Sequence, residues 1–253
     1  MKNNFFFKNT FTNIYEKSSK KSPISSQILY GEKFKIISKN KNWLKIKTSF
    51  DSYVGYINNI NYINKFKPTH KVCKLKASIF TKSKNRNFNK TKYYLTFASK
   101  ITLLNNYKKK FLEYQKNKWI RKSDIKRINH VEKNYLKILK LFLKTKYVWG
   151  GKTFQGVDCS AILQLFFYYN NKFYPRDTKD QIKYSPKEIK RKIFKKGDII
   201  FWKGHVAICA DSKNLIHAYG PEKKVLIMPI TKTINKIERT AKLKVKKISS
   251  IKY

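Results

Sequence analysis

Cysteine, proline, glycine and acidic residues are all scarce in this chain of 253 residues. It has 3 Cys, 6 Pro and 8 Gly, and 14 Asp+Glu stand against 59 Lys+Arg. Three cysteines, Cys73, Cys159 and Cys209, cannot supply the framework of a disulfide-stabilised secreted fold. A reducing environment, which keeps a working thiol available, suits this composition better.

Long apolar runs are also missing. The first ten residues contain only Phe5–Phe7 as an apolar run, which is shorter than the core of a secretory signal. No stretch approaches the roughly 18–20 apolar residues of a membrane helix. We therefore expect a cytoplasmic protein without a membrane segment.

No metal or cofactor site is visible in the sequence. The three cysteines and four histidines are too scattered for zinc-ligand spacing. A phosphate-binding glycine loop is absent as well. The sequence therefore predicts chemistry that needs no metal and no cofactor.

The excess of basic residues gives a formal net charge of +45. Taken alone, such a charge favours nucleic acid or another anionic partner. However, the basic residues are almost all Lys, and Lys, Asn, Ile, Phe and Tyr, which have AT-rich codons, dominate the chain. An AT-biased genome explains this pattern without selection for binding. We still expect nonspecific attraction to anionic polymers at low salt.

The most informative stretch is residues 147–160, YVWGGKTFQGVDCS. A strand-like start ends at two glycines, and after a short loop Asp158, Cys159 and Ser160 precede an apolar run that reaches residue 169. This order predicts a thiol in the first turn of a buried helix over 159–169. The partial positive charge of a helix N-terminus favours a thiolate.

Six segments in one order resemble the NlpC-type bacterial cell-wall cysteine peptidases. They are Tyr147–Gly151, Gly156–Ser160, Tyr174–Thr178, Lys196–Trp202, Gly204–Ile208 and Leu215–Ala218. The resemblance implies a papain-like α+β fold, with a central helix packed on an antiparallel sheet. The preceding half resembles the paired bacterial SH3-like barrels of one branch of this family.

Four regions follow from composition and periodicity. Residues 1–22 are polar and basic and predict a flexible arm. Residues 23–66 and 67–125 carry short period-two strands and predict two small β-barrels, which the family resemblance implies are SH3-like. Residues 126–253 form the predicted catalytic domain, which begins with an amphipathic helix over 130–144. Strands are expected near 193–202, 206–210, 215–219, 225–230 and 242–248.

Cys159, His205 and His217 are the predicted catalytic residues. Cys159 is the nucleophile, His205 is the base that takes the proton from the thiol, and His217 orients the His205 ring. A three-residue loop over 211–213 would place His217 opposite Ala207, on the same face as His205. A two-residue loop would separate the two imidazoles, so the triad predicts the odd loop or a bulge.

Other residues near the thiol have roles that the family resemblance implies. The Tyr147 hydroxyl and the Cys159 backbone N–H are candidates for oxyanion binding. Asp158 is a candidate ligand for the free α-amino group of the substrate, with Ser160 beside it, although Asp158 equally suits a helix cap. Arg176 would bind a glutamate carboxylate or brace the fold, because only six arginines occur in the chain.

The resemblance implies a cysteine endopeptidase that cleaves the γ-D-glutamyl to diamino-acid bond of peptidoglycan stem peptides. The diamino acid would be diaminopimelate or lysine, and the first SH3-like barrel would restrict cleavage to peptides with a free N-terminal L-Ala. An amidase or acyltransferase with the same Cys-His-His site is the first alternative. A basic nucleic-acid-binding SH3-like protein with a vestigial enzyme domain, or a wall-binding module, is the second.

Overall fold

The chain divides into two compact units in the computed structural model, which describes residues 4–58, 60–85, 87–104, 107–108, 110–191 and 193–251. Unit 1 contains residues 1–131 together with 169–171, and unit 2 contains residues 132–168 and 172–253. None of the helices among the described residues has the length and hydropathy that a membrane-crossing helix requires.

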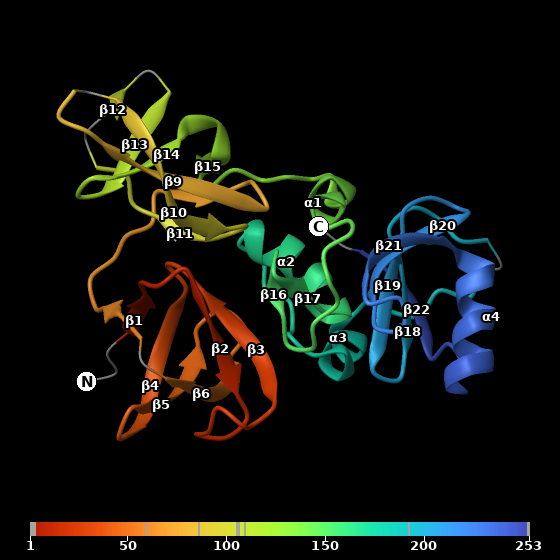
Figure 1. The fold of residues 1–253 in the computed structure, drawn as a ribbon. Coiled ribbons are helices and arrows are strands. Elements are labelled where there is room, and N and C mark those ends of the chain that lie inside the picture. Colours follow the sequence, from red (N-terminus) through yellow and green to blue (C-terminus); the bar gives the residue numbers. More distant parts are fainter. Residues whose placement is uncertain are drawn as a thin grey trace. The chain divides into compact units, whose positions relative to one another are not determined.

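The first part of unit 1 is a seven-stranded sheet with the order β3-β2-β6-β5-β4-β1-β7, coloured red to orange in Figure 1. Its strands are β1 (Asn4–Phe7), β2 (Phe11–Tyr15), β3 (Ile24–Leu29), β4 (Lys33–Asn40), β5 (Trp43–Thr48), β6 (Val54–Asn58) and β7 (Tyr62–Ile63). The predicted alternation is confirmed in β5, where Leu44 and Ile46 are buried and Lys47 is exposed.

The predicted flexible arm over residues 1–22 is wrong for residues 4–15. Most of these residues form β1 and β2, and both strands pair within the sheet. Phe7 and Ile14 are fully buried in its core. Burial of these apolar side chains outweighs the polar and basic residues between them, which the composition argument had weighed too heavily.

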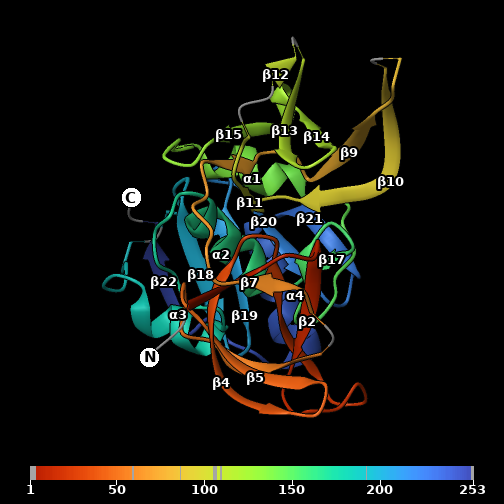
Figure 2. The ribbon, with the colours of Figure 1, turned by 90° about the vertical axis from the view of Figure 1, so that its left-hand side faces the viewer.

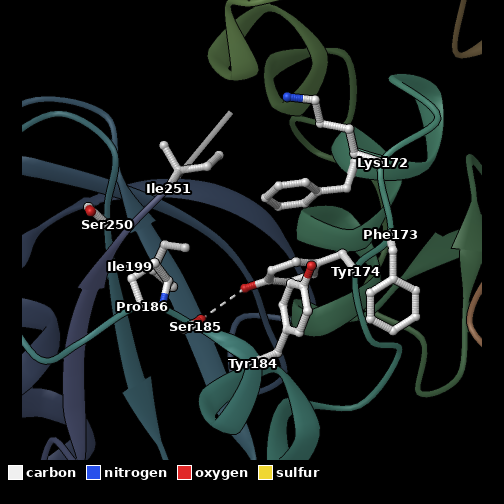
Figure 3. Close-up of a pocket in the computed structure, with 10 residues that line it drawn as sticks. Lys172, Phe173, Tyr174, Tyr184, Ser185, Pro186, Ile199, Ser250 and Ile251 are labelled. Atoms are coloured by element: carbon white, nitrogen blue, oxygen red, sulfur yellow. Dashed lines mark hydrogen bonds between the residues drawn. The ribbon is translucent and has the colours of Figure 1, made fainter.

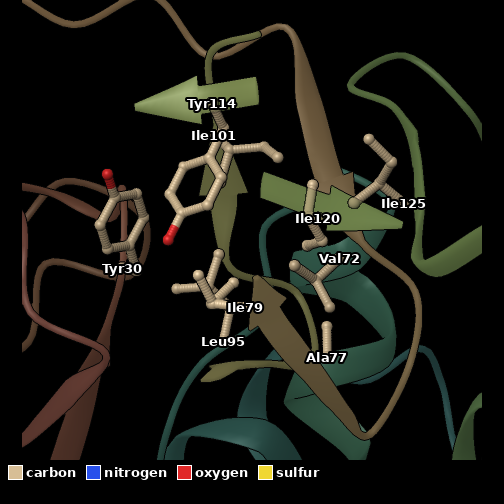
Figure 4. Close-up of a cluster of buried hydrophobic side chains, with 9 residues drawn as sticks. All are labelled: Tyr30, Val72, Ala77, Ile79, Leu95, Ile101, Tyr114, Ile120 and Ile125. Carbon is tan, nitrogen blue, oxygen red and sulfur yellow. The ribbon is translucent and has the colours of Figure 1, made fainter. Parts of the chain in front are cut away.

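The second part of unit 1 holds a five-stranded sheet, β10-β9-β14-β13-β12, and a three-stranded sheet, β11-β8-β15. The strands are β8 (His70–Val72), β9 (Lys76–Lys82), β10 (Phe88–Thr96), β11 (Lys100–Ile101), β12 (Tyr107–Lys108), β13 (Phe111–Gln115), β14 (Lys118–Arg121) and β15 (Ile125–Arg127), with a 3₁₀ turn at Lys122–Asp124. Figure 2 shows β9 and β10 as a long hairpin. Their shared core includes Val72, Ile79 and Ile120, and the ring of Tyr30 from the first part joins it (Figure 4).

Unit 2 combines short helices with a five-stranded antiparallel sheet, β21-β20-β19-β18-β22 (Figure 1). Its elements are α1 (Tyr135–Leu141), β16 (Lys152–Thr153), β17 (Gly156–Val157), α2 (Cys159–Tyr169), α3 (Thr178–Tyr184), β18 (Asp198–Trp202), β19 (His205–Cys209), β20 (Asn214–Tyr219), β21 (Lys224–Pro229), α4 (Ile230–Ala241) and β22 (Lys247–Ser250). Every residue of α2 is buried, as the apolar run predicted, so this helix is the centre of the unit.

Several predicted elements of unit 2 are wrong in extent. The helix expected over 130–144 is shorter, because α1 begins at Tyr135. The strand expected over 242–248 is instead β22, which begins at Lys247. Helix α4 was not predicted, although Ile230, Thr233 and Ile237 are buried at helical spacing on its inner face.

Candidate active site

Cys159 is the first residue of α2, as the sequence predicted, and only 3% of it is exposed. The residue before it caps the helix, because the Asp158 carboxylate accepts a hydrogen bond from the backbone N–H of Ala161 at 2.8 Å. The first N–H groups of a helix have no partner within it, and this cap satisfies one of them. The cap therefore fixes where α2 starts and where the thiol points.

Asp158 also binds a buried arginine. Arg176 donates to both carboxylate oxygens, at 3.0 and 2.6 Å, and to the Ser160 hydroxyl at 2.9 Å. Ser160 itself donates to Asp158, and the backbone N–H of Gly150 donates at 2.9 Å. Five donors thus converge on one carboxylate. This geometry supports a structural role for Asp158, Ser160 and Arg176, which hold the start of α2 in place. Direct contact of these residues with a substrate stays a prediction.

The glycines of the motif let two backbone segments touch. A Cβ on Gly151 would lie 2.4 Å from the Gly156 carbonyl oxygen, and a Cβ on Gly156 would lie 2.2 Å from a Val148 methyl group. Both distances are shorter than any carbon contact allows. Only glycine therefore fits at these two positions. Strands β16 and β17 pair in the same region, directly before Asp158.

The sulfur of Cys159 contacts two backbone groups at the start of β19. Strand β19 pairs with β20 at Ile208 and Cys209, whereas the β18–β19 ladder continues to His205. Alternate residues of an antiparallel strand face the same neighbour, so the Gly204 C=O and the Val206 N–H point to the side of β20. The sulfur takes both groups: it donates to the Gly204 oxygen at 3.9 Å and accepts from the Val206 N–H.

Burial opposes the thiolate that the helix N-terminus was expected to favour. Burial first, and then the nearby Asp158 carboxylate, raise the pKa of the Cys159 thiol, which lies at about 11. Hydrogen bonds from the Val206 N–H and the Thr178 hydroxyl, and the charge of Arg176, lower this pKa but do not outweigh burial. The thiol is therefore protonated at neutral pH and needs a base to release its proton.

The two predicted histidines lie together. Nε2 of His205 and Nδ1 of His217 are 2.9 Å apart. The predicted three-residue loop is confirmed, since the Ala210 N–H donates to the Asn214 oxygen at 2.8 Å. Continuing the register of Ile208 with Ile216 places His217 opposite Ala207, as expected.

Both imidazoles are held neutral. Burial lowers the pKa of His205 to about 4. Burial, His205 and the Lys236 ammonium together lower the pKa of His217 well below its ordinary value. Because Nε2 of His205 is engaged with His217, Nδ1 is the His205 atom left for a proton from the thiol. The described residues show no hydrogen bond between this ring and Cys159.

The Tyr147 phenol lies in the electrostatic range of the thiol. Burial raises the pKa of Tyr147, and electrostatic interactions with Cys159 and the Asp158 carboxylate raise it further. A protonated phenol is a hydrogen-bond donor, which an oxyanion requires. The oxyanion role of Tyr147 stays a prediction. Its protonated hydroxyl can donate the hydrogen bond that this role needs.

Residues 144–242 match the NlpC/P60 family, and residues 14–59 match the bacterial dipeptidyl-peptidase SH3 domain. The chain carries an NlpC/P60 domain. This finding makes it a cysteine-type peptidase, with an SH3 domain in unit 1.

Two curated proteins and one solved structure illustrate the similarity. The gamma-D-glutamyl-L-lysine dipeptidyl-peptidase of Bacillus subtilis (strain 168) is 26% identical over 239 residues, which cover 86% of this chain and 80% of that protein. The protein of the same name from Bacillus cereus (strain ATCC 10987) is 31% identical over 99 residues, 36% of this chain and 29% of that protein. A crystal structure of an NlpC/P60 family protein from Bacillus cereus ATCC 10987 has a TM-score of 0.76 at 19% identity, over 90% of this chain and 94% of that one, and supports the fold.

Sequence reasoning missed two contacts of the thiol in the NlpC/P60 domain. Thr178 stands in one of the six matching segments, and its hydroxyl hydrogen-bonds to the sulfur. Gly204, with a φ of 75°, makes the tight turn between β18 and β19 and presents its carbonyl to the thiol. The matching segment that contains Thr178 could have revealed its contact with the thiol. The Gly204 contact depends on where the pairing of β19 with its neighbours ends, which the sequence does not show.

The NlpC/P60 domain contains a separate cavity of about 450 Å³, and its wall includes none of the predicted catalytic residues. Figure 3 shows Phe173, Tyr174 and Tyr184 on one wall and Ile199 and Ile251 on another. The Phe167 and Tyr174 rings stack at 4.1 Å between centroids.

Among the described residues, no group of three or more His, Cys, Asp or Glu is arranged to hold a metal ion.

Proposed function

We propose that this peptidase hydrolyses the γ-D-glutamyl to diamino-acid bond of peptidoglycan stem peptides with a free N-terminal L-Ala. The observation that carries the proposal is the 2.9 Å contact of His205 on β19 with His217 on β20. It lies beside Gly204 and Val206, whose backbone groups contact the Cys159 sulfur. The names of the two curated relatives support the choice of bond.

In the proposed reaction, the Cys159 sulfur attacks the carbonyl carbon of the γ-glutamyl amide while its proton moves to Nδ1 of His205. The oxyanion that forms accepts hydrogen bonds from the Tyr147 hydroxyl and the Cys159 N–H. His205 then protonates the leaving amine of the diamino acid, and a thioester remains on the sulfur. Water, deprotonated by His205, hydrolyses the thioester and frees the thiol.

His217 can hold His205 in the tautomer that this reaction needs. His205 can accept a proton at Nδ1 only if its own hydrogen is on Nε2, where it donates to Nδ1 of His217. His217 then carries its hydrogen on Nε2, an atom that is buried without a hydrogen-bond partner among the described groups. The opposite tautomer leaves a bare acceptor there, so the pair is finely balanced.

The proposal is tested by incubating wild type and Cys159→Ser with L-Ala-γ-D-Glu-L-Lys and with the diaminopimelate analogue. We expect wild type to release L-Ala-γ-D-Glu from at least one peptide, as detected by mass spectrometry, and the variant to release none. Peptides with an acetylated L-Ala serve as the control for the free amine. Transfer to an added amine without hydrolysis would favour the acyltransferase, and folded wild type without any turnover would contradict the proposal.

We also propose that residues 67–125 form a second SH3-like barrel. The described strands β8–β14 in this range, with one buried core, support it. The matched SH3 domain, residues 14–59, lies in the first part of unit 1. An experimental structure of unit 1 would test the assignment through the strand order.

A further inference from the structure

Unit 1 contains a cavity of about 210 Å³ that has no part in the proposed hydrolysis. Its lining includes Lys8 and Asn9, from the connection between β1 and β2, together with Tyr114 and Lys118. None of the residues that line the cavity is Asp or Glu. Lys8 and Lys118 thus line a cavity that contains no carboxylate to pair with them.

The Lys8 ammonium is held inside this cavity by aromatic groups. It donates a hydrogen bond to the Tyr30 hydroxyl and lies 4.3 Å from the centroid of the Tyr30 ring and 4.7 Å from that of Phe66. An ammonium has three N–H donors, so two remain beyond the bond to Tyr30. None of the described carboxylates forms an ion pair with Lys8 or Lys118.

This arrangement has an electrostatic cost. Burial first, and then the Lys118 charge, lower the pKa of Lys8 to about 8. Lys8 is therefore still mainly protonated at neutral pH, close to a second cation and poorly hydrated. An anion between the two ammonium groups would remove both penalties at once.

The neutral polar groups of the cavity are arranged as donors as well. The Tyr30 oxygen accepts from Lys8 and keeps its own O–H to donate. The Asn9 side-chain oxygen accepts from the backbone N–H of Asn61 at 2.7 Å, which leaves the NH₂ group of Asn9 as its second polar function. Donors without a competing acceptor are what carboxylate and phosphate oxygens require.

We propose that this cavity is a binding site for a small oxyanion, a carboxylate or phosphate group held between Lys8 and Lys118. Its volume is several times the roughly 30 Å³ that a water molecule occupies, so one such group fits with part of the molecule that carries it. The site is independent of Cys159, and it gives unit 1 a ligand-binding function separate from hydrolysis.

The test is isothermal titration of the full chain with phosphate, succinate and D-glutamate at pH 7, with sodium chloride keeping ionic strength constant. Cys159→Ser is used throughout, so that binding is read without turnover and regardless of whether the proposed function holds. We expect saturable binding of at least one anion and at least a tenfold loss of affinity in Lys8→Gln/Lys118→Gln. Preference among the three distinguishes phosphate from carboxylate ligands.

The matched control is Lys35→Gln/Lys47→Gln, which removes two exposed lysines that lie opposite each other on β4 and β5. This variant loses the same charge and should bind as wild type does. Equal losses in both variants, or no saturable binding, would overturn the proposal in favour of the general attraction of a basic protein. If the double variant does not fold, Lys118→Gln is titrated alone, after circular dichroism has shown that it is folded. Loss of anion affinity in this variant supports the site, and unchanged affinity overturns it.

A second readout follows the ammonium itself. With ¹³C-methylated lysines, the Lys8 resonance is assigned by its absence in Lys8→Gln. Bound anion should raise the Lys8 pKa by about one unit, while Tyr30, Tyr114 and Lys118 are the titratable groups that face it. An unchanged Lys8 pKa at saturating anion would contradict the site.

Discussion

At the scale of single residues, the site combines a thiol that resists ionisation with two imidazoles that resist protonation. Burial is the first cause in each case, raising the pKa of Cys159 to about 11 and lowering that of His205 to about 4. The resting pair is therefore neutral. The proton moves only as the substrate carbonyl is attacked, when the new oxyanion compensates the charge on the imidazolium.

The first prediction concerns the acid limb of the pH profile. His205 can accept a proton only when it is neutral, and with a pKa of about 4 it stays neutral well below pH 6. We expect kcat/KM for the stem peptide to rise with pH through about 4 and to be flat near neutrality. Steady-state kinetics between pH 3.5 and 8, with circular dichroism to confirm folding, measures this. An acid limb near 6.5 would show that His205 is solvated as an ordinary histidine.

The second prediction concerns the buried ion pair of Asp158 and Arg176. Asp158→Asn leaves the Arg176 guanidinium buried without its counter-charge, and we expect a loss of about 3–5 kcal/mol in the free energy of unfolding. Urea denaturation measures the loss. The double variant Asp158→Asn/Arg176→Met removes the buried charge as well and should recover part of it. A double variant less stable than the single one would contradict this account.

At the scale of elements, the approach of β17 to the loop before it depends on glycine. Gly151→Ala places a methyl group against the Gly156 carbonyl, which is backbone and cannot move alone. We expect a loss of about 1–3 kcal/mol, from thermal or urea unfolding, together with lower activity. Gly220→Ala is the control, because its Cβ would make only ordinary contacts of 3.5 Å or more with Tyr147. Equal stability of the two variants would refute the close-approach argument.

The sequence predicted the elements whose signals are local. The apolar run after Cys159 located α2, and the spacing of His205 and His217 correctly required an odd hairpin loop. Prediction from the sequence failed where residues distant in the chain determine the structure. Burial by the sheet, not the helix N-terminus, controls the Cys159 thiol, and pairing with distant strands orders residues 4–15. The helical period of Ile230 and Ile237 was present in α4 but was overlooked beside a strand pattern.

At the scale of the whole molecule, the net charge of +45 acts on every surface at once. Like charges repel within the folded chain, and salt screens this repulsion. We therefore expect the melting temperature to rise as sodium chloride increases from 20 to 300 mM at pH 7. Differential scanning calorimetry at each salt concentration measures it. A melting temperature that falls with salt would mean that favourable ion pairs dominate.

The contacts of the Cys159 sulfur link the nucleophile to the backbone of the β18–β19 turn. The S–H donates to the Gly204 C=O, and the sulfur accepts from the Val206 N–H. Acylation removes the S–H, so the Gly204 oxygen loses this donor for as long as the thioester exists. Each turnover therefore breaks one hydrogen bond at the turn and restores it when the product leaves.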